Sequence, residues 1–206
     1  MTAAYRICRS IVHAAAHLWF DFKVFGKEHL VDGGAVLACN HVSFSDPPLC
    51  SLGFEHEIWF LGRSTLFRHK FAQWLLPQLN CLPIDRDNAD ISGLRGIIKV
   101  LRSGNRVVLF PEGTRSVDGS LRDPENGVGF IVSKAGVPVQ PMRLFGSFEA
   151  FPRNSLFPRP HPIRLVIGPA LHFSREELDG RDKEAYPRIA RRIMDAIAAL
   201  KVPDGE

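Results

Sequence analysis

The sequence predicts an α/β fold, in which a mixed, largely parallel sheet is flanked by helices and preceded by an N-terminal amphipathic helical segment. Short apolar runs typical of buried strands recur at 35–39, 58–62, 106–110, 137–144 and 163–167. Stretches with helical spacing of apolar residues alternate with these runs, at 3–25, 64–79, 90–102, 127–135 and 182–200. The chain of 206 residues, 45% of them hydrophobic, is long enough to bury one sizeable core.

The first helical segment is amphipathic and basic. Its apolar stripe consists of Ile7, Ile11, Ala14, Leu18, Phe22 and Phe25. Another face carries Arg6, Arg9, His13 and His17. A helix of this kind either lies on a membrane surface or packs on its own domain, and the pattern alone leaves both interpretations open.

Proline, glycine and serine mark the ends of the later elements. Pro47 opens a short helix, because proline is tolerated in the first helical turn. Gly136 ends the helix at 127–135. The stretch 145–161 is rich in proline and aromatic residues and is predicted to be a loop. Ser174 and Glu177 match a capping box.

Three loops with reactive or charged side chains follow predicted strands, at 40–46, 85–86 and 111–116. In parallel sheets, binding sites form from the loops at the carboxyl ends of the strands. We therefore expect these loops to lie together and to form the functional site.

The first loop contains His41 and Asp46, between Asn40 and Pro47. A histidine with a carboxylate within reach is a common general base, because the carboxylate fixes the tautomer and stabilises the imidazolium. The alternative is a structural histidine in a turn, with Asp46 capping the helix that follows. These residues alone do not separate the two.

The third loop combines a carboxylate, a glycine, a hydroxyl and a guanidinium, in Glu112, Gly113, Thr114 and Arg115. An arginine fork can bind phosphate oxygens, and glycine lets the backbone approach a ligand closely. Arg86 in the second loop is a further candidate phosphate clamp. Each loop could also be an ordinary turn, with Arg86 in a surface ion pair.

Several other functions lack their sequence signatures. The chain has no serine-hydrolase elbow, no phosphate-binding P-loop, no dinucleotide fingerprint and no zinc motif, so we expect no metal and no resident cofactor. The formal net charge of +4 suits an anionic membrane surface or a phosphorylated substrate. No basic run interleaved with aromatic residues indicates nucleic-acid binding. We also expect no transmembrane helix, and the four unpaired cysteines indicate a reducing compartment.

Four ordered motifs resemble those of the glycerolipid acyltransferase family, which includes the lysophospholipid and 1-acylglycerol-3-phosphate acyltransferases. They are Asn40-His41-x4-Asp46, Leu82-Pro-Ile-Asp-Arg86, Phe110-Pro-Glu-Gly-Thr-Arg-Ser116 and Val137-Pro-Val-Gln-Pro141. The resemblance covers about residues 26–170. It implies an acyltransferase domain at 26–206, preceded by a membrane-docking helical segment at 1–25, on the cytoplasmic face of a membrane.

The resemblance also implies the reaction and the role of each residue. A fatty acyl group would move from acyl-CoA or acyl-carrier protein to a lysophospholipid hydroxyl, with His41 as general base and Asp46 as its partner. The acceptor would be bound by Arg86, Glu112, Gly113, Thr114 and Arg115. Val137 and Pro138 would shape the site or an acyl pocket.

One departure from the family pattern bears on the acceptor. The family commonly has a lysine beside a glycine about a dozen residues after the third motif, but the stretch 124–127 has none. Acceptors other than 1-acylglycerol-3-phosphate, such as another lysophospholipid or an ornithine-lipid precursor, therefore remain open. An inert lipid-binding module and a thioesterase are alternatives from other classes.

Overall fold

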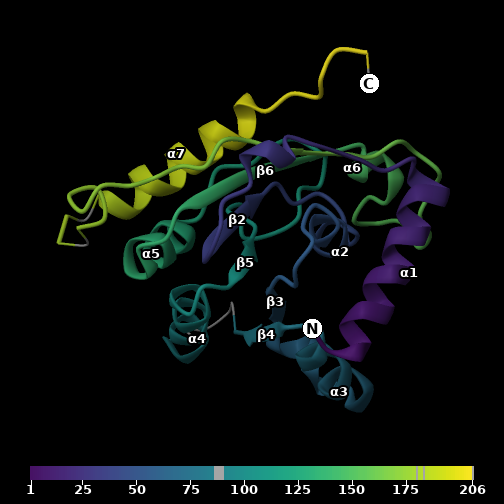
Figure 1. Ribbon diagram of the computed structural model, residues 1–206, viewed down its shortest axis with the longest axis horizontal. Helices are drawn as coiled ribbons and strands as arrows, with labels where there is room; N and C mark the ends of the chain where they lie inside the picture. Colours follow the sequence, from purple (N-terminus) through teal and green to yellow (C-terminus); the bar gives the residue numbers. More distant parts are fainter. Residues whose placement is uncertain (86–90, 180, 183, 206) are drawn as a thin grey trace.

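The computed structural model describes residues 1–85, 91–179, 181–182 and 184–205. Its main sheet has five strands in the order β1-β7-β6-β2-β5 (Figure 1). Their bounds are β1 Lys23–Phe25, β2 Ala35–Cys39, β5 Arg106–Leu109, β6 Val139–Phe145 and β7 Arg164–Ile167. Every pair is parallel except the antiparallel β6–β7 pair. The prediction of a mixed, largely parallel sheet is confirmed.

A second, two-stranded parallel sheet consists of β3 (Phe60–Arg63) and β4 (Cys81–Ile84). Trp59 links it to the main sheet, because the Trp59 N–H donates to the Arg106 carbonyl and the Val108 N–H donates to the Trp59 carbonyl. The predicted strand at 58–62 therefore begins slightly late in the structure.

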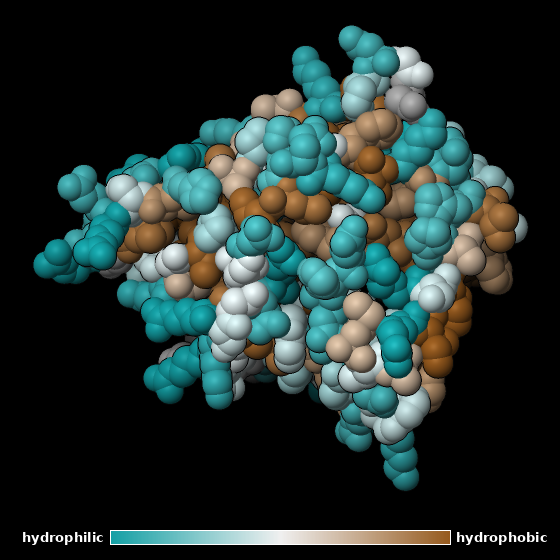
Figure 2. All heavy atoms as spheres, in the orientation of Figure 1, coloured by the Kyte–Doolittle hydropathy of each residue, from teal (hydrophilic) through white to brown (hydrophobic). Residues whose placement is uncertain are grey.

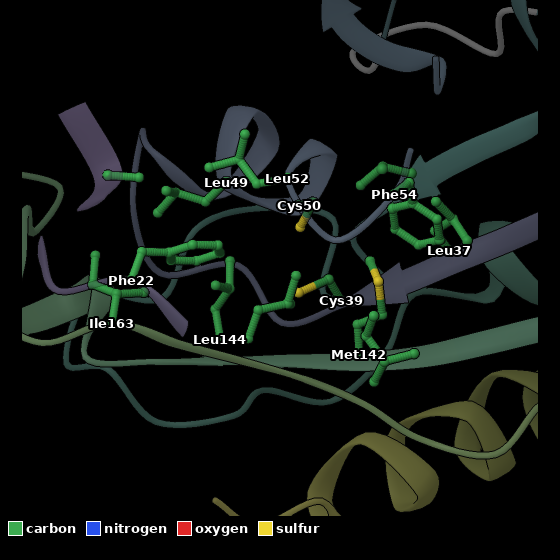
Figure 3. Packing of buried hydrophobic residues seen from close by; sticks show 14 of the residues in the cluster. Phe22, Leu37, Cys39, Leu49, Cys50, Leu52, Phe54, Met142, Leu144 and Ile163 are labelled. Carbon is green, nitrogen blue, oxygen red and sulfur yellow. The ribbon is translucent and has the colours of Figure 1, made fainter. Parts of the chain in front are cut away.

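Helices cover both faces of the main sheet. They are α1 Ala3–Phe20, α2 Asp46–Ser51, α3 Lys70–Gln78, α4 Ile91–Arg102, α5 Asn126–Ala135, α6 Ser147–Ala150 and α7 Ala185–Ala199. One core lies between the sheet and α1 and α2, with Phe22, Leu37 and Met142 buried in it (Figure 3). The second lies between the sheet and α4, α5 and α7, with Ile97, Val132 and Ile193. Burial of these faces is the main stabilising term.

The first helix is shorter than the sequence predicts. It ends at Phe20, and Asp21 adopts a left-handed conformation with φ of 40°. The chain then forms β1, the edge strand beside β7. Arg164 anchors this corner with an ion pair of 2.8 Å to Asp21. A three-residue edge strand leaves no periodic signal in the sequence. The predicted helical stripe is therefore wrong at Phe22 and Phe25, which follow the end of α1.

Three further elements refine the predictions. The stretch 64–79 is a 3₁₀ helix, Ser64–Arg68, followed by α3. The predicted loop at 145–161 contains the short helix α6. Ser174 and Glu177 form both hydrogen bonds of a capping box, at 3.2 and 2.8 Å, but they close a turn and no helix continues from it.

The apolar stripe predicted on α1 faces solvent. Ile7, Ile11 and Leu18 are 61%, 63% and 87% exposed, whereas Tyr5 and Phe20 pack against the domain. The helix therefore has two apolar faces, one for its own domain and one left uncovered. Within the described residues, no helix is long and apolar enough to cross a bilayer.

Candidate active site

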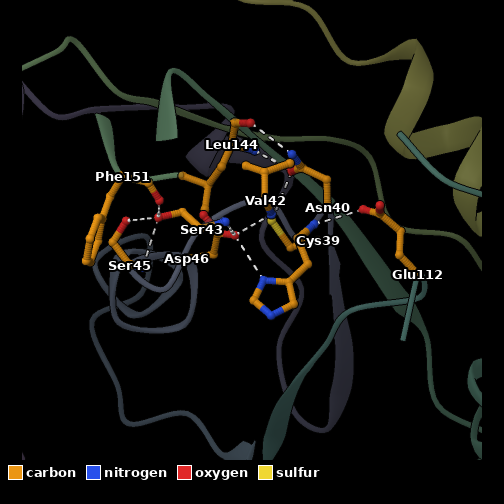
Figure 4. Close-up of polar contacts among 10 residues, drawn as sticks. Cys39, Asn40, Val42, Ser43, Ser45, Asp46, Glu112, Leu144 and Phe151 are labelled. Carbon is orange, nitrogen blue, oxygen red and sulfur yellow. Dashed lines mark hydrogen bonds and ion pairs between the residues drawn. The ribbon is translucent and has the colours of Figure 1, made fainter. Parts of the chain in front are cut away.

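The catalytic candidate His41 lies directly beyond the carboxyl end of β2, which is pinned in place by Asn40. The Asn40 side chain donates to the Leu144 carbonyl at 3.0 Å and accepts from the Leu144 N–H at 2.8 Å (Figure 4). Because both bonds are buried, they fix the end of β2 against β6. The turn that follows therefore starts from a defined position.

Asp46 organises this turn through one oxygen. Its Oδ2 accepts from the backbone N–H groups of Val42 and Ser43 at 2.7 and 2.6 Å, and lies 3.0 Å from His41 Nδ1. The carboxylate is fully buried, while the His41 side chain is 12% exposed. Asp46 is the first residue of α2 rather than its N-cap, which is Ser45. The alternative interpretation, in which Asp46 caps the helix, is therefore wrong, and the contact between Asp46 and His41 is present.

Glu112 joins the first and third loops. Its two carboxylate oxygens accept from the backbone N–H groups of His41 at 2.8 Å and Arg122 at 3.2 Å. The side chain is 2% exposed, and this burial raises the pKa of Glu112, against the lowering effect of its two backbone donors. Glu112 therefore links the two loops through their backbones, and a direct contact with substrate stays a prediction.

Two more contacts hold the histidine. The Phe110 ring stacks on the imidazole, with ring centroids 4.0 Å apart and an interplanar angle of 18°. The Ser116 N–H donates to the His41 carbonyl at 2.8 Å. Together with Asp46, they limit the imidazole to one orientation.

Arg115 extends beside the same turn. Its guanidinium carbon lies 3.5 Å from the centroid of the Phe44 ring, which orients the fork by a cation–π contact. Partial burial, with a contribution from the positive charge of Arg153, lowers the pKa of Arg115, while Asp46 opposes this effect. Arg115 Nη1 is buried and has no hydrogen-bond partner among the described residues. A buried donor without a partner is unfavourable, so an anionic ligand that reached it would be held by a strong hydrogen bond.

A cleft of about 480 Å³ opens beside these loops. It is lined by Phe110, Gly113 and Thr114 from the third loop and by Leu94 and Ile131 from α4 and α5. Gly113 has φ of +68°, and a Cβ there would lie 2.8 Å from Glu125 Cγ, so a side chain would be strained. The predicted site residue Arg86 lies outside the described residues.

An apolar cavity of about 330 Å³ begins on the other side of the catalytic turn. Pro47 and Pro48, directly after Asp46, form one wall, and residues of α1, α3 and β3 form the others. Leu61 lines both this cavity and the cleft. Burial raises the pKa of the Cys81 thiol in its wall to about 11, so that group stays neutral.

The fourth motif, Val137-Pro-Val-Gln-Pro141, begins at the opposite end of the sheet from His41. The Pro138 carbonyl accepts from the Val36 N–H at 3.0 Å, near the beginning of β2 and thus at the sheet edge opposite His41. Neither Val137 nor Pro138 lines the cleft or the cavity described above. Pro138 thus holds the beginning of β2, and Val137 packs against the core beside α4, α5 and α7. That the two residues shape the site or an acyl pocket stays a prediction.

Sequence reasoning missed the aromatic supports of the site, Phe110 and Phe44. Phe110 follows Leu109, which is paired with Ala38, so the register of β5 on β2 brings Phe110 to His41. A sequence does not reveal that register. The available signal was position, because Phe44 lies inside the loop 40–46 and Phe110 comes directly before the loop 111–116.

The fold and the site define the class of the protein. A largely parallel α/β sheet presents a His/Asp pair and an arginine-bearing turn at one edge. Among the described residues, His41 contacts Asp46, Glu112 and Phe110, and none of these is a serine or cysteine nucleophile. The Acyltransferase family pattern matches residues 21–144. The chain belongs to the Acyltransferase family and is an enzyme of that class.

Within this family, the chain is similar to enzymes named 1-acyl-sn-glycerol-3-phosphate acyltransferases. The chain is 30% identical over 171 residues to the 1-acyl-sn-glycerol-3-phosphate acyltransferase of Bacillus subtilis, covering 82% of each chain. It is 29% identical to the chloroplastic enzyme LPAT1 of Arabidopsis thaliana, of which it spans 55%. The crystal structure of the 1-acyl-sn-glycerophosphate acyltransferase PlsC from Thermotoga maritima superposes with a TM-score of 0.73 and 26% identity, covering 97% of this chain and 81% of that one.

Proposed function

We propose that the chain is a 1-acylglycerol-3-phosphate O-acyltransferase, which moves a fatty acyl group from an acyl thioester to the free hydroxyl of the lysophospholipid. The observation that carries the proposal is the 3.0 Å contact between His41 Nδ1 and Asp46 Oδ2. An ionised carboxylate only accepts hydrogen bonds, so it holds the proton on Nδ1. The second ring nitrogen, Nε2, is then the one that takes a proton.

The reaction follows from that arrangement. His41 Nε2 removes the hydroxyl proton as the acceptor oxygen attacks the thioester carbonyl carbon. A C–O bond forms, and the carbonyl oxygen takes the negative charge of a tetrahedral intermediate. Collapse of the intermediate breaks the C–S bond, and the imidazolium returns its proton to the leaving thiolate. The products are an ester and a free thiol, and no acyl-enzyme is needed.

Asp46 acts through His41. Its negative charge favours the imidazolium that forms during attack, and its bonds to two backbone N–H groups keep it in place. Glu112 holds the His41 backbone from the other side. We infer that both carboxylates position the base, and that only His41 exchanges a proton with the substrates.

The acceptor phosphate is assigned to the cleft beside the third loop. Gly113 and Thr114 line the cleft, and the next residue, Arg115, has a buried donor without a partner. We include Arg86 as a second phosphate ligand on the strength of its motif alone. The apolar cavity that starts at Pro47 is assigned to an acyl chain, because its walls are almost entirely apolar and it adjoins the catalytic turn.

Membrane docking is proposed for α1, so that the enzyme lies peripherally on the cytoplasmic face of a membrane. The uncovered stripe at Ile7, Ile11 and Leu18 supports this (Figure 2, apolar atoms along the right edge, where α1 lies in Figure 1). Leu156 and Phe157 are 87% and 77% exposed in the loop after α6. That loop returns to α1, because the Ile163 N–H donates to the Phe20 carbonyl at 2.8 Å.

The acyl-transfer proposal is tested with purified protein, an acyl thioester and a panel of lysophospholipids that differ in head group. We expect thiol release that depends on the acceptor and is fastest with 1-acylglycerol-3-phosphate, with phosphatidic acid as the product. A different preferred head group would change the acceptor and keep the reaction. Thiol release that is the same without any acceptor would indicate a thioesterase and contradict the proposal.

Membrane docking is tested by sedimentation with anionic vesicles. The variant Ile7→Ser/Ile11→Ser/Leu18→Ser is expected to lose most of its vesicle binding and to keep its thermal stability, because these side chains are exposed. Ala198→Ser/Ala199→Ser on the exposed face of α7 is the matched control. Truncation at residue 25 is unsuitable, because it removes β1 and the buried Phe22. Equal binding by the triple variant would remove α1 from the docking surface.

A further inference from the structure

The seam between α4 and α5 carries a concentration of positive charge. A groove of about 480 Å³ along this seam is lined by Arg95, Lys99, Arg102 and Lys134, together with Ile98 and Ser103. Neither helix contains an aspartate or a glutamate. The chain has 26 basic and 22 acidic residues, so these four residues equal its whole excess of positive charge.

The charges are exposed and form a row. Arg95, Lys99 and Arg102 are spaced at i, i+4 and i+7 on α4, so they lie on one face over about 10 Å. Arg102 donates to the Lys134 carbonyl, which fixes α4 against α5. The Lys134 ammonium lies 5.9 Å from the Phe130 ring centroid. In the part of the chain that the structure describes, no carboxylate forms an ion pair with Arg95, Lys99 or Lys134.

The basic groove lies next to the active-site cleft on the same two helices. The cleft is lined by Leu94 of α4 and Ile131 of α5, and the groove is lined by Ile98 and Lys134, one helical turn further along each helix. A ligand that reaches the third loop from the side of α4 and α5 therefore crosses the groove. Position and charge together indicate a surface for a large acidic partner of the reaction.

We propose that this groove docks an acidic acyl-carrier protein, which delivers the acyl thioester through the cleft to His41. This proposal rests on the acyl-transfer function proposed above and specifies its donor. A row of cations over two helical turns matches acidic side chains on the helix of a partner. The nucleotide of acyl-CoA fits the groove less well, because no aromatic side chain lines it to hold an adenine ring.

The membrane is a poorer match for the groove than a carrier protein. The exposed large hydrophobic residues lie on α1, on α3 and the 3₁₀ helix before it, in the loop at 151–162, and at Phe44 and Val117 near the active-site turns. None lies on α4 or α5 among the described residues. In Figure 1, α1 and the pair α4–α5 lie on opposite sides of the molecule. A carrier protein in solution and a lysophospholipid in the membrane could thus be bound together.

The test compares two donors with the same acyl chain, one on acyl-carrier protein and one on CoA. The variant Arg95→Glu/Lys99→Glu leaves the Arg102–Lys134 contact intact. It is expected to lower kcat/KM with the carrier donor by about tenfold or more, to leave the CoA donor within about twofold, and to weaken the salt dependence of the carrier reaction. The control, Arg175→Glu/Lys201→Glu, changes the net charge equally on exposed residues.

Direct binding of the carrier protein to the two variants gives a second measurement that does not depend on turnover. The double variant should bind the carrier at least about tenfold more weakly than the control variant does. Unchanged carrier kinetics and binding would overturn the proposal, as would an equal loss with both donors or a loss of vesicle binding instead. Transfer from acyl-CoA alone would also overturn it and keep the acyltransferase function, whereas transfer from neither donor would refute that function itself.

Discussion

The two turns that form the active site, 40–46 and 111–116, lie side by side. They differ in how far their polar groups are satisfied by hydrogen bonds within the protein. In the first, Asp46 Oδ2 receives three contacts, and the His41 ring is held by Asp46 at Nδ1 and by Phe110 on one face. In the second, Arg115 Nη1 has no partner among the described residues and Thr114 is exposed. The reacting group is therefore fixed in advance, while the ligand-binding turn keeps a hydrogen-bond donor that only a ligand would satisfy.

The largest effect on activity should come from a substitution in the turn 40–46, which holds His41 in place. Asp46→Asn removes the negative charge beside His41 Nδ1 and lets the amide stabilise the wrong tautomer. We expect kcat to fall by about 10²- to 10⁴-fold with the acceptor KM little changed. Asp195→Asn, at an exposed aspartate of α7, is the control. A loss expressed only in KM would move Asp46 from the base to acceptor binding.

A substitution in the turn 111–116 should mainly change the binding of the acceptor. Arg115→Ala removes the unpartnered donor, so the KM for the phosphorylated acceptor should rise by about ten- to a hundredfold, with a smaller change in kcat. Arg175→Ala tests the loss of an exposed arginine elsewhere. If instead kcat falls and KM stays constant, Arg115 acts on the transition state and the contrast between the two turns is lost.

A stability effect is expected where the turn 40–46 begins. Asn40→Ala leaves the N–H and the carbonyl of Leu144 without their buried partners. The free energy of unfolding should fall by about 2 kcal/mol, measured by urea denaturation. Exposed Asn154→Ala should change it by less than about 0.5 kcal/mol. An equally small change in unfolding free energy for both variants would show that Asn40 does not stabilise the end of β2.

The smallest effect is a pH dependence from Glu112. Burial raises its folded-state pKa above the ordinary 4.5, so folding favours the protonated form. The resulting stabilisation is complete below 4.5 and is lost as pH rises through the folded-state pKa. The unfolding free energy of wild type minus that of Glu112→Gln should therefore decrease with rising pH in this range. An increase would mean that the two backbone donors outweigh burial.

The elements that could be predicted are those whose signal is local. The run at 35–39, the glycine after α5 and the order of the loops fixed the strands, the helix end and the site edge in advance. The His41–Asp46 pair was predictable because both residues lie in one short turn. The capping box at Ser174 was correct locally and failed as a helix signal, because no apolar face follows it.

What could not be predicted depends on contacts between distant segments. The pairing of β1 with β7 shortens α1, and the register of β5 on β2 brings Phe110 to His41. Glu112 is buried because it bonds to the backbone of His41, which lies 71 residues away in the sequence. The sequence does not reveal that these two loops meet. The orientation of α1 is another example, since its predicted apolar stripe faces away from the domain that it covers.

The central claim is that His41 is the base for the acceptor hydroxyl, and one comparison tests it most directly. Acceptor-dependent thiol release is measured for wild type and for His41→Ala at equal concentrations of folded protein, verified by circular dichroism and thermal unfolding. We predict that the variant loses at least about 10²-fold in kcat and unfolds as cooperatively as wild type. Undiminished acceptor-dependent release by a folded His41→Ala variant would contradict the claim.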